Sequence, residues 1–390
     1  MKQSDYLSPA FVQRLMHQHT PDNDIQVLDV QPLPIDNSAS ILAALTAGLS
    51  DNVIGHLGLA VTFQSVGVRQ TRRMVMKIKP PGSAIVAMLN GLARACGGTL
   101  AEVYPAYKEL TGFRHTDRRE LEVYGKLPSS LQPHIFGLLA HPEQGTYIIL
   151  MEYLDDVTLM NSVMSPHTWS DGHIRQALDQ MAVWHARHLG KKLPIDPAYW
   201  DDAPSLAHMT SLTPLWTALL NNAMQHAPAL YTPARVARLR AVIKAIPDYW
   251  RELDQLPKTL VHNDLNPRNT CFKLIDGAAV FCVYDWELAT YHVPQYDVVE
   301  LLCFVLDADR YHLRPAYLAH YRNALHQLTG LYADEQAFNR GFDLAAFDFG
   351  LHRLGMYMMA HSVSPYPFLP RVVNSYFDTL ASGISFPNNA

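Results

Sequence analysis

Residues 259–287 read TLVHNDLNPRNTCFKLIDGAAVFCVYDWE, and this stretch decides what we expect of the chain around it. Its apolar runs and turn residues predict a strand, a polar loop, and two further strands. Asp276-Gly277, between the last two strands, is typical of a two-residue hairpin turn. The segment therefore predicts a polar loop that lies beside a small antiparallel hairpin.

Three oxygen-bearing side chains of this segment are expected to meet. Asp264 and Asn269 lie five positions apart on the loop, and Asp285 ends the last strand. Phosphoryl transfer requires a carboxylate that faces the attacking hydroxyl, and Mg²⁺ prefers hard oxygen ligands. The pattern is therefore typical of a phosphoryl-transfer site.

Residues 1–154 mix strands with helices, and residues 155–390 are mostly helical, so we place a boundary at position 154. Before the boundary we expect helices at 7–19, 41–49, 84–95 and 116–127, and strands at 25–33, 58–66, 73–79 and 147–154. After it, apolar residues at helical spacing predict helices at 171–190, 213–225, 233–247, 297–307, 314–329 and 345–362. We therefore expect an α+β fold with a β-rich lobe at 1–154 and a larger helical lobe at 155–390, joined by a hinge and not by a flexible tether.

Length and composition agree with a two-lobed globular chain. At 390 residues the chain exceeds the size of one hydrophobic core. Its formal net charge of -5 supplies no general attraction to nucleic acid or to an anionic membrane. The four cysteines form no CxxC pair, and no apolar stretch is long enough to span a membrane. We expect a cytoplasmic protein with reduced thiols, which binds neither nucleic acid nor membrane.

The motifs HNDLNPRN at 262–269 and YDWE at 284–287 resemble the aminoglycoside phosphotransferase and choline kinase superfamily. The resemblance implies a protein-kinase-like fold with ATP and Mg²⁺ as cofactors. It implies that Asp264 is the catalytic base, that Asn269 and Asp285 bind the metal, and that His262 braces the loop. Asp297 would hold that loop from the start of the next helix, and His185 would be structural.

The resemblance also implies a lysine that binds the ATP phosphates. RMVMKIK at 73–79 is similar to the third strand of a kinase, with Lys77 in the lysine position and Lys79 as a second candidate. RELEVY at 119–124 nominates Glu120 as the partner of this lysine, and Glu122 or Glu102 are alternatives.

The other nucleotide contacts are less distinctive in the sequence. No GxGxxG is present, and the loop at 35–40, with Ser38 and Ser40, stands where a phosphate-covering loop is expected. Glu152 and Leu154 occupy the hinge position, where the backbone would bind adenine.

The partner is expected to be a small-molecule hydroxyl acceptor, and the sequence leaves its class open. An aminoglycoside would require a run of carboxylates, and the candidates considered in the segment 195–255 are Asp201, Asp202, Glu252 and Asp254, which form no such run. A quaternary amine such as choline would require an aromatic box. The available aromatic residues, which are more often core at this spacing, are Tyr291, Tyr296, Tyr311, Tyr317, Tyr321, Phe347, Phe349 and Tyr357.

Two other functional interpretations remain at this stage. The degenerate phosphate loop is compatible with a nucleotide-binding pseudokinase that acts as a regulatory module. Asn266, two positions after Asp264, and Glu287 replace residues that protein kinases require, which disfavours protein kinase activity. We expect a monomer or a homodimer.

Overall fold

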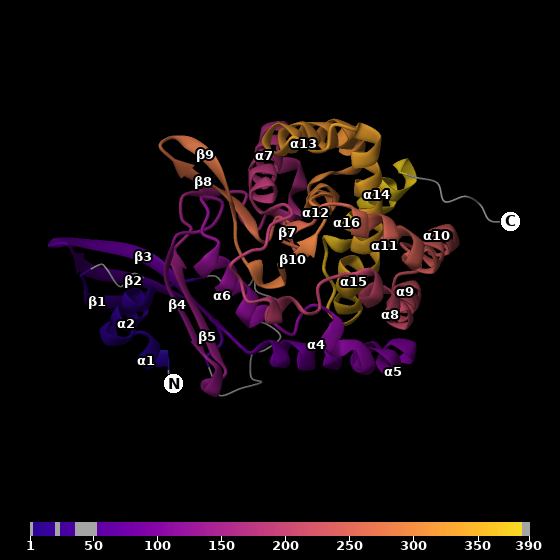
Figure 1. The fold of residues 1–390 in the computed structure, drawn as a ribbon. Coiled ribbons are helices and arrows are strands. Elements are labelled where there is room, and N and C mark those ends of the chain that lie inside the picture. The colour runs from indigo at the N-terminus through magenta and orange to yellow at the C-terminus, as the bar shows by residue number, and fades with distance from the viewer. Residues whose placement is uncertain (1–2, 20–23, 36–52, 384–390) are drawn as a thin grey trace.

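The computed structural model describes residues 3–19, 24–35 and 53–383. A β-rich part at the N-terminal end lies beside a larger, mostly helical part (Figure 1). The expected α+β class is therefore confirmed. The helix expected at 41–49 and the loop residues Ser38 and Ser40 lie outside the described residues.

The N-terminal part is built on a five-stranded antiparallel sheet in the order β1-β2-β3-β5-β4. Its strands are β1 (Ile25–Leu33), β2 (Gly55–Ser65), β3 (Val68–Lys79), β4 (Ile135–His141) and β5 (Thr146–Glu152). Val66 and Gly67 join β2 to β3 and both have positive φ, at 50° and 77°, as a two-residue turn of this twist requires. The register places Lys77 of β3 between His56 of β2 and Ile149 of β5.

One helix covers a face of this sheet and forms a small separate core. After the single-turn α1 (Gln3–Tyr6), α2 (Pro9–His19) is preceded by Ser8, whose hydroxyl accepts a hydrogen bond from Phe11 N at 3.3 Å. Phe11, Val12, Leu15 and Met16 of α2 are buried against apolar residues of β1, β2, β3 and β5.

Three helices connect β3 to β4. They are α4 (Gly82–Cys96), α5 (Gly98–Tyr107) and α6 (Thr116–Lys126). Helix α5 packs on α9 (Thr213–His226) and α4 packs on α15 (Arg353–Val363), and both lie along the helical part in Figure 1. Helix α6 contacts the short turn that follows Asp285. The large core therefore joins helices from both ends of the sequence.

The helical part contains α7 (Asp171–His188), α8 (Leu206–Ser211), α9, α10 (Pro233–Lys244), α11 (Ile246–Gln255), α12 (Gln295–Val305), α13 (Arg314–Thr329), α14 (Glu335–Leu351), α15 and α16 (Leu369–Ser382). Two sequence expectations were wrong here. The helix expected at 233–247 is two helices, because the chain turns at Ala245 just before Pro247. The helix expected at 345–362 is interrupted at His352, where α14 ends and α15 begins.

Short strands frame the polar loop that opened the sequence analysis. They are β6 (Val157–Thr158), β7 (Thr259–Val261), β8 (Thr270–Ile275), β9 (Ala278–Val283) and β10 (Thr290–His292). The β8–β9 hairpin is confirmed, and its turn residues Asp276 and Gly277 have φ of 51° and 80°. The loop 262–269 therefore runs between β7 and β8.

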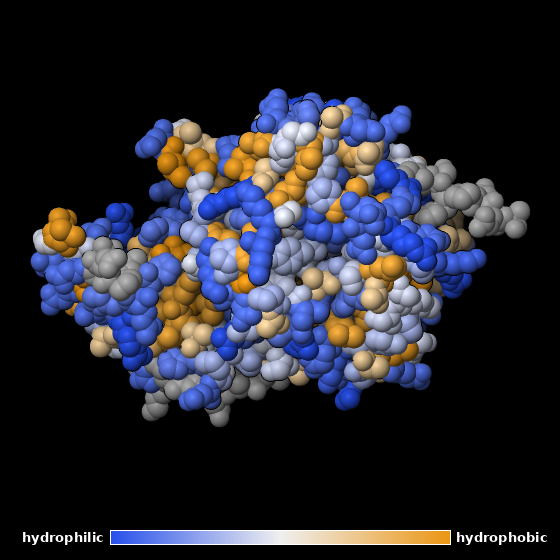
Figure 2. Space-filling view, viewed as in Figure 1, coloured by the Kyte–Doolittle hydropathy of each residue, from blue (hydrophilic) through white to orange (hydrophobic). Residues whose placement is uncertain are grey.

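The surface is mainly hydrophilic on the face that Figure 2 shows, with apolar side chains at the tips of the β2–β3 and β8–β9 hairpins. Val66 and Val68 are exposed at the first tip, and Leu274 and Ile275 at the second. All four cysteines are buried and free. Among the described residues, no helix has the length and apolar character that crossing a membrane demands.

Candidate active site

One buried carboxylate, that of Asp297, fixes the backbone of the polar loop. Asp297, in the first turn of α12, accepts hydrogen bonds from the backbone N–H of His262 at 2.8 Å and of Asn263 at 3.0 Å. Its carboxylate also lies 3.0 Å from Nε2 of His185 on α7. Asn263 has a φ of 60°, an uncommon conformation that these hydrogen bonds stabilise. Asp297 thus holds the backbone of the loop in one conformation.

His262 joins the loop to the end of β9. Its Nε2 lies 3.0 Å from the carbonyl of Tyr284, which can only accept, so this nitrogen carries the proton. The imidazole is fully buried and packs against the ring of Trp286, with the centroids 4.7 Å apart. His262 therefore sets the position of the loop relative to Asp285 and does not line the cavity described below.

Asp264 lies at the centre of a dense set of hydrogen bonds. Its Oδ2 accepts from Nδ2 of Asn269 at 2.8 Å, and its Oδ1 accepts from Nη2 of Arg353 at 2.5 Å. The hydroxyl of Tyr357 donates to the same Oδ1. Burial alone would raise the pKa of Asp264, but the charges of Arg353 and Arg268 lower it below its ordinary value. The carboxylate is therefore ionised at neutral pH.

Asp285 lies directly opposite the lysine of β3. Its Oδ1 is 2.7 Å from Nζ of Lys77, and that amine also donates to both carboxylate oxygens of Glu120 at 2.9 Å. Burial opposes ionisation of Asp285, but Lys77 and Lys79 hold its pKa well below the ordinary value. Asp285 has a φ of 66°, a strained conformation for this residue type and one that recurs at functional sites.

The alternatives to Glu120 are placed elsewhere. Glu122 pairs with Lys126 at 2.7 Å and accepts from the backbone N–H of Asp196. Glu102 is exposed on α5. Of the three glutamates considered, Glu120 is thus the one in contact with Lys77.

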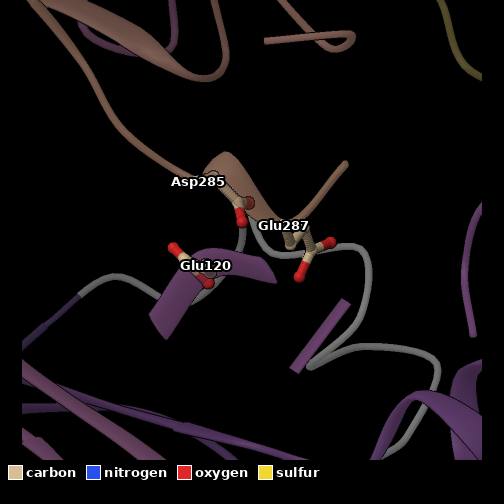
Figure 3. Close-up of side chains that lie close together, drawn as sticks. All are labelled: Glu120, Asp285 and Glu287. Carbon is tan, nitrogen blue, oxygen red and sulfur yellow. The ribbon is translucent and has the colours of Figure 1, made fainter. Parts of the chain in front are cut away.

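Lys79 forms a second ion pair beside the first. Its Nζ lies 2.8 Å from Glu287 and contacts Glu120, and it donates to the carbonyl of Thr116 at 3.0 Å. Figure 3 shows Glu120, from α6, close to Asp285 and Glu287, from the segment after β9. One oxygen from each carboxylate lies within 4.8 Å of those of the other two. Burial, followed by the charge of Asp285, raises the pKa of Glu287 to about 7.

This group of carboxylates fits a hard divalent cation. Three carboxylates so close together repel one another, and the two lysines offset only part of their charge. Asn269 uses its Nδ2 to bind Asp264, so its amide oxygen is available as a further hard ligand. The donor set is therefore one that Mg²⁺ accepts.

One cavity brings these residues together. It lies between β3, α4, the loop 262–269 and α15. Its polar lining consists of His56, Lys77, Lys79, Asp264, Arg268, Asn269, Asp285, Glu287, Arg353, Tyr357 and Tyr366. Its apolar lining includes Ile85, Met88, Leu89, Leu92, Phe113, Met356 and Ala360.

The expected hinge residues lie apart from this cavity. Glu152 ends β5, and its side chain contacts Nζ of Lys273 at 2.7 Å and the backbone N–H of His134 at 2.9 Å. Leu154 follows on the segment between β5 and β6. Neither residue lines the cavity around Asp264.

Arg268, Glu287 and Arg353 were not nominated as site residues from the sequence, and Tyr357 was considered only for an aromatic box. Arg268 and Glu287 lie within the motifs and carried a local signal, because a charged residue stands one position before Asn269 and two after Asp285. Arg353 and Tyr357 lie on α15, and Arg353 is 89 positions from Asp264. Only the packing of α15 against the loop reveals them.

The candidate acceptor residues are largely dispersed. Of the eight aromatic residues considered for a box, Tyr357 lines the cavity. Tyr296, Tyr317, Tyr321, Phe347 and Phe349 are buried in the core, which confirms the core interpretation for them. The acidic residues Asp201, Asp202, Glu252 and Asp254 do not line the cavity either.

A two-lobed chain with a lysine–glutamate pair across from a polar loop has the fold class of kinases. The family described as the phosphotransferase enzyme family (APH) matches residues 63–338. The chain belongs to this family of phosphotransferases. No curated protein matches the chain.

Several solved structures are similar at low identity. An ethanolamine kinase of Plasmodium vivax is 13% identical with a TM-score of 0.46, over 90% of this chain and 81% of that chain. A thermostable mutant of aminoglycoside phosphotransferase APH(4)-Ia, in complex with ADP and hygromycin B, is 12% identical with a TM-score of 0.42, over 96% and 99%. A microcompartment-associated aminopropanol kinase is 12% identical with a TM-score of 0.38, over 86% and 89%.

Proposed function

We propose that this chain transfers the γ-phosphate of ATP, in the presence of Mg²⁺, to a hydroxyl group of a small molecule. The observation that carries the proposal is that Lys77, Asp264, Asn269 and Asp285 all line one cavity. These residues come from two distant parts of the sequence and supply the groups that phosphoryl transfer needs.

In this proposal Asp264 orients the acceptor hydroxyl and receives its proton. The ionised state of Asp264 supports that role, because the carboxylate form can accept a proton and the protonated acid cannot. His262 and Asp297 act on the loop, and they keep Asp264 in position without touching the reacting atoms.

Asp285 and Asn269 would hold the metal, with Glu287 as a further ligand, and Lys77 would bind the phosphates while Glu120 orients it. Bound Mg²⁺ would offset the negative charge of the transferring phosphate. The backbone of Glu152 and Leu154 would hold adenine, so that the nucleotide lies between a lobe at 1–154 and a lobe at 155–390.

The test is ATP consumption with Mg²⁺ across a panel of hydroxy acids, amino alcohols, sugars, nucleosides and antibiotics. We expect at least one acceptor to support turnover, and Asp264→Asn to lower kcat by about 10²–10⁴-fold while it still binds Mg-ATP. The assay pairs kcat with the Kd of Mg-ATP from calorimetry. Nucleotide binding without turnover on any acceptor would favour a regulatory pseudokinase. Turnover that persists in Asp264→Asn would show that Asp264 is not the catalytic base.

A further inference from the structure

The wall of the cavity beside Asp264 is cationic. Arg353 on α15 contacts Asp264, and Arg268 on the loop donates through Nη2 to the hydroxyl of Tyr357 at 2.9 Å. Both guanidinium groups line the cavity, and we call them the arginine pair. Arg353 is 4% exposed, and its Nε is buried with no hydrogen-bond partner among the residues that the structure describes. The pair therefore retains donor capacity next to the reacting carboxylate.

The aromatic rings at this end of the cavity already bind cations. The Tyr357 ring has Arg353 at 5.0 Å and Arg268 at 5.4 Å from its centroid. Phe113 has Arg353 at 5.8 Å. A quaternary amine would have to displace an arginine from these faces, and a polycation would approach two fixed positive charges. This wall thus disfavours cationic acceptors.

One member of the arginine pair, Arg268, has no carboxylate partner among the described residues. The groups that face the arginine pair are Asp264 and Glu300, whose carboxylate accepts from the backbone N–H of Leu265 at 3.1 Å. Arg353 forms its ion pair with Asp264, whereas Arg268 forms no ion pair among the described residues and donates to the neutral hydroxyl of Tyr357. Burial also raises the pKa of Glu300 to about 8, which weakens this carboxyl group as a partner for the arginine pair.

Much of the remaining cavity lining is apolar. Ile85, Met88, Leu89 and Leu92 lie at helical spacing on α4, so they present one face to the cavity. Ala360, on the helix that carries Arg353 and Tyr357, adds a further apolar residue to the lining. An acceptor that fills the cavity therefore needs an apolar body beside its charged end.

We propose that the acceptor is a hydroxy acid with an apolar chain, whose carboxylate binds the arginine pair while its hydroxyl faces Asp264. Because Arg353 touches Asp264, the carboxylate and the hydroxyl must be a few bonds apart, as in a 2- or 3-hydroxy acid. The inference rests on the proposed function and names its substrate class. The hydroxyl oxygen bonds to the γ-phosphorus, the bond from this phosphorus to the bridging oxygen breaks, ADP keeps that electron pair, and the proton passes to Asp264.

Three matched probes separate the charge classes. They are 3-hydroxyoctanoate, 1,3-octanediol and 1-amino-3-octanol, which share the hydroxyl and the alkyl chain and differ at the end that would face the arginine pair. We expect kcat/KM for 3-hydroxyoctanoate to exceed that for the diol by about 10–100-fold, the value of charge-assisted hydrogen bonds, and the amine to be the poorest. Thermal stabilisation of the full chain by each probe, with a non-hydrolysable Mg-ATP analogue present, gives a readout besides turnover.

Variants test the assignment of the arginine pair. Arg268→Gln should remove the preference for the carboxylate and raise its KM while the KM of ATP stays the same, and Arg240→Gln, an exposed residue of α10, should behave as the wild type. Ala360→Asp, which adds a negative charge to the cavity, should disfavour 3-hydroxyoctanoate relative to 1-amino-3-octanol.

Other outcomes overturn the inference. Equal use of the three probes, preference for the amine, or no binding of 3-hydroxyoctanoate would reject the hydroxy-acid class, although the proposed function would stand if Mg-ATP still binds. If Arg268→Gln raised the KM of ATP and kept the acceptor preference, the arginine pair would bind nucleotide phosphate instead. Absence of Mg-ATP binding by the wild type would reject the proposed function itself.

Discussion

At the scale of single residues, a buried carboxylate organises the loop that carries Asp264. Asp297 is fully buried and is the acceptor for two successive backbone N–H groups at 262 and 263. A carboxylate with two oxygens suits this role, since each N–H group is satisfied away from water. The position of Asp264 therefore depends on a residue that never faces the cavity.

The substitution Asp297→Asn should destabilise the fold and slow turnover. The amide replaces one acceptor oxygen with a donor, so one buried N–H group loses its partner, at a cost of about 1–3 kcal/mol in the free energy of unfolding. Urea denaturation measures this cost, and kinetics should show a lower kcat with little change in the KM of ATP. Asp309→Asn, at an exposed position, is the control and should stay within about 0.5 kcal/mol of the wild type.

Lys258 carries a pH-dependent contribution to stability. Its Nζ lies 4.8 Å from the centroid of the Trp250 ring and has no hydrogen-bond partner among the described residues, and burial lowers its pKa to about 8. The pKa of a lysine in an unfolded chain is about 10.4, so between these two pKa values the unfolded chain binds more protons than the folded one. The contribution of Lys258 to stability therefore increases as pH rises from 8 to about 10.

Lys258→Met should remove this part of the pH profile. We expect the Tm of the wild type minus that of Lys258→Met to grow between pH 7.5 and 10, and calorimetry at several pH values measures it. The control Lys244→Met, at an exposed position of α10, should behave as the wild type. Its Tm minus that of Lys258→Met should therefore also grow over this pH range. A pH-independent difference for Lys258→Met would contradict the prediction.

At the scale of elements, α4 contributes apolar residues to the cavity, and its first residue contacts α6. Its first residue, Gly82, donates its backbone N–H to Asp117 at 2.9 Å. A Cβ at Gly82 would lie 2.0 Å from the carbonyl oxygen of Arg114, whereas a Cβ at Gly91 would meet nothing within 4 Å. The two glycines of one helix therefore have opposite structural requirements.

The paired substitutions Gly82→Ala and Gly91→Ala should change stability in opposite directions. The first forces the backbone of α4 away from Arg114 and should cost about 1–3 kcal/mol, as overpacking does. The second removes the entropic cost of glycine inside a helix and should add about 0.5–1 kcal/mol. Chemical denaturation of both variants beside the wild type is the measurement, and destabilisation by Gly91→Ala would show that α4 is packed differently.

At the scale of the whole molecule, the candidate nucleotide site is assembled from both parts of the fold. Lys77 and Glu120 come from β3 and α6, and Asp285 follows β9. A ligand that binds both Lys77 and Asp285 stabilises the folded chain as a unit, because the unfolded chain offers no such arrangement.

Mg-ATP should therefore raise the Tm of the wild type in a concentration-dependent way. At a free concentration of 100 times Kd the stabilisation amounts to about 2.7 kcal/mol. Asp285→Ala should lose this response, whereas Asp276→Asn, in the turn of the β8–β9 hairpin, should keep it. Differential scanning fluorimetry with and without Mg²⁺ measures the shift, and an undiminished shift for Asp285→Ala would exclude Asp285 as a metal ligand.

The sequence by itself determined the local elements and the residues that lie close along the chain. The strand at Ile25–Leu33, the helix at Arg314–Thr329 and the turn at Asp276-Gly277 follow from side-chain periodicity and from the φ values that glycine permits. The motif containing Asp264 and Asn269 could be recognised because its members share one loop. Such features depend on neighbours along the chain, so a sequence pattern records them.

Only the tertiary structure decided which distant residues meet. Strand β4 and helix α5 were not predicted, and α5 contains Pro105, which ordinarily ends a helix but is accepted here in a helix that packs on α9. The contact of Arg353 and Tyr357 with Asp264 depends on how α15 packs against the loop, across 89 and 93 positions of sequence. No local pattern encodes such a contact, because it results from packing of the whole core, and these contacts define the wall that we assign to the acceptor.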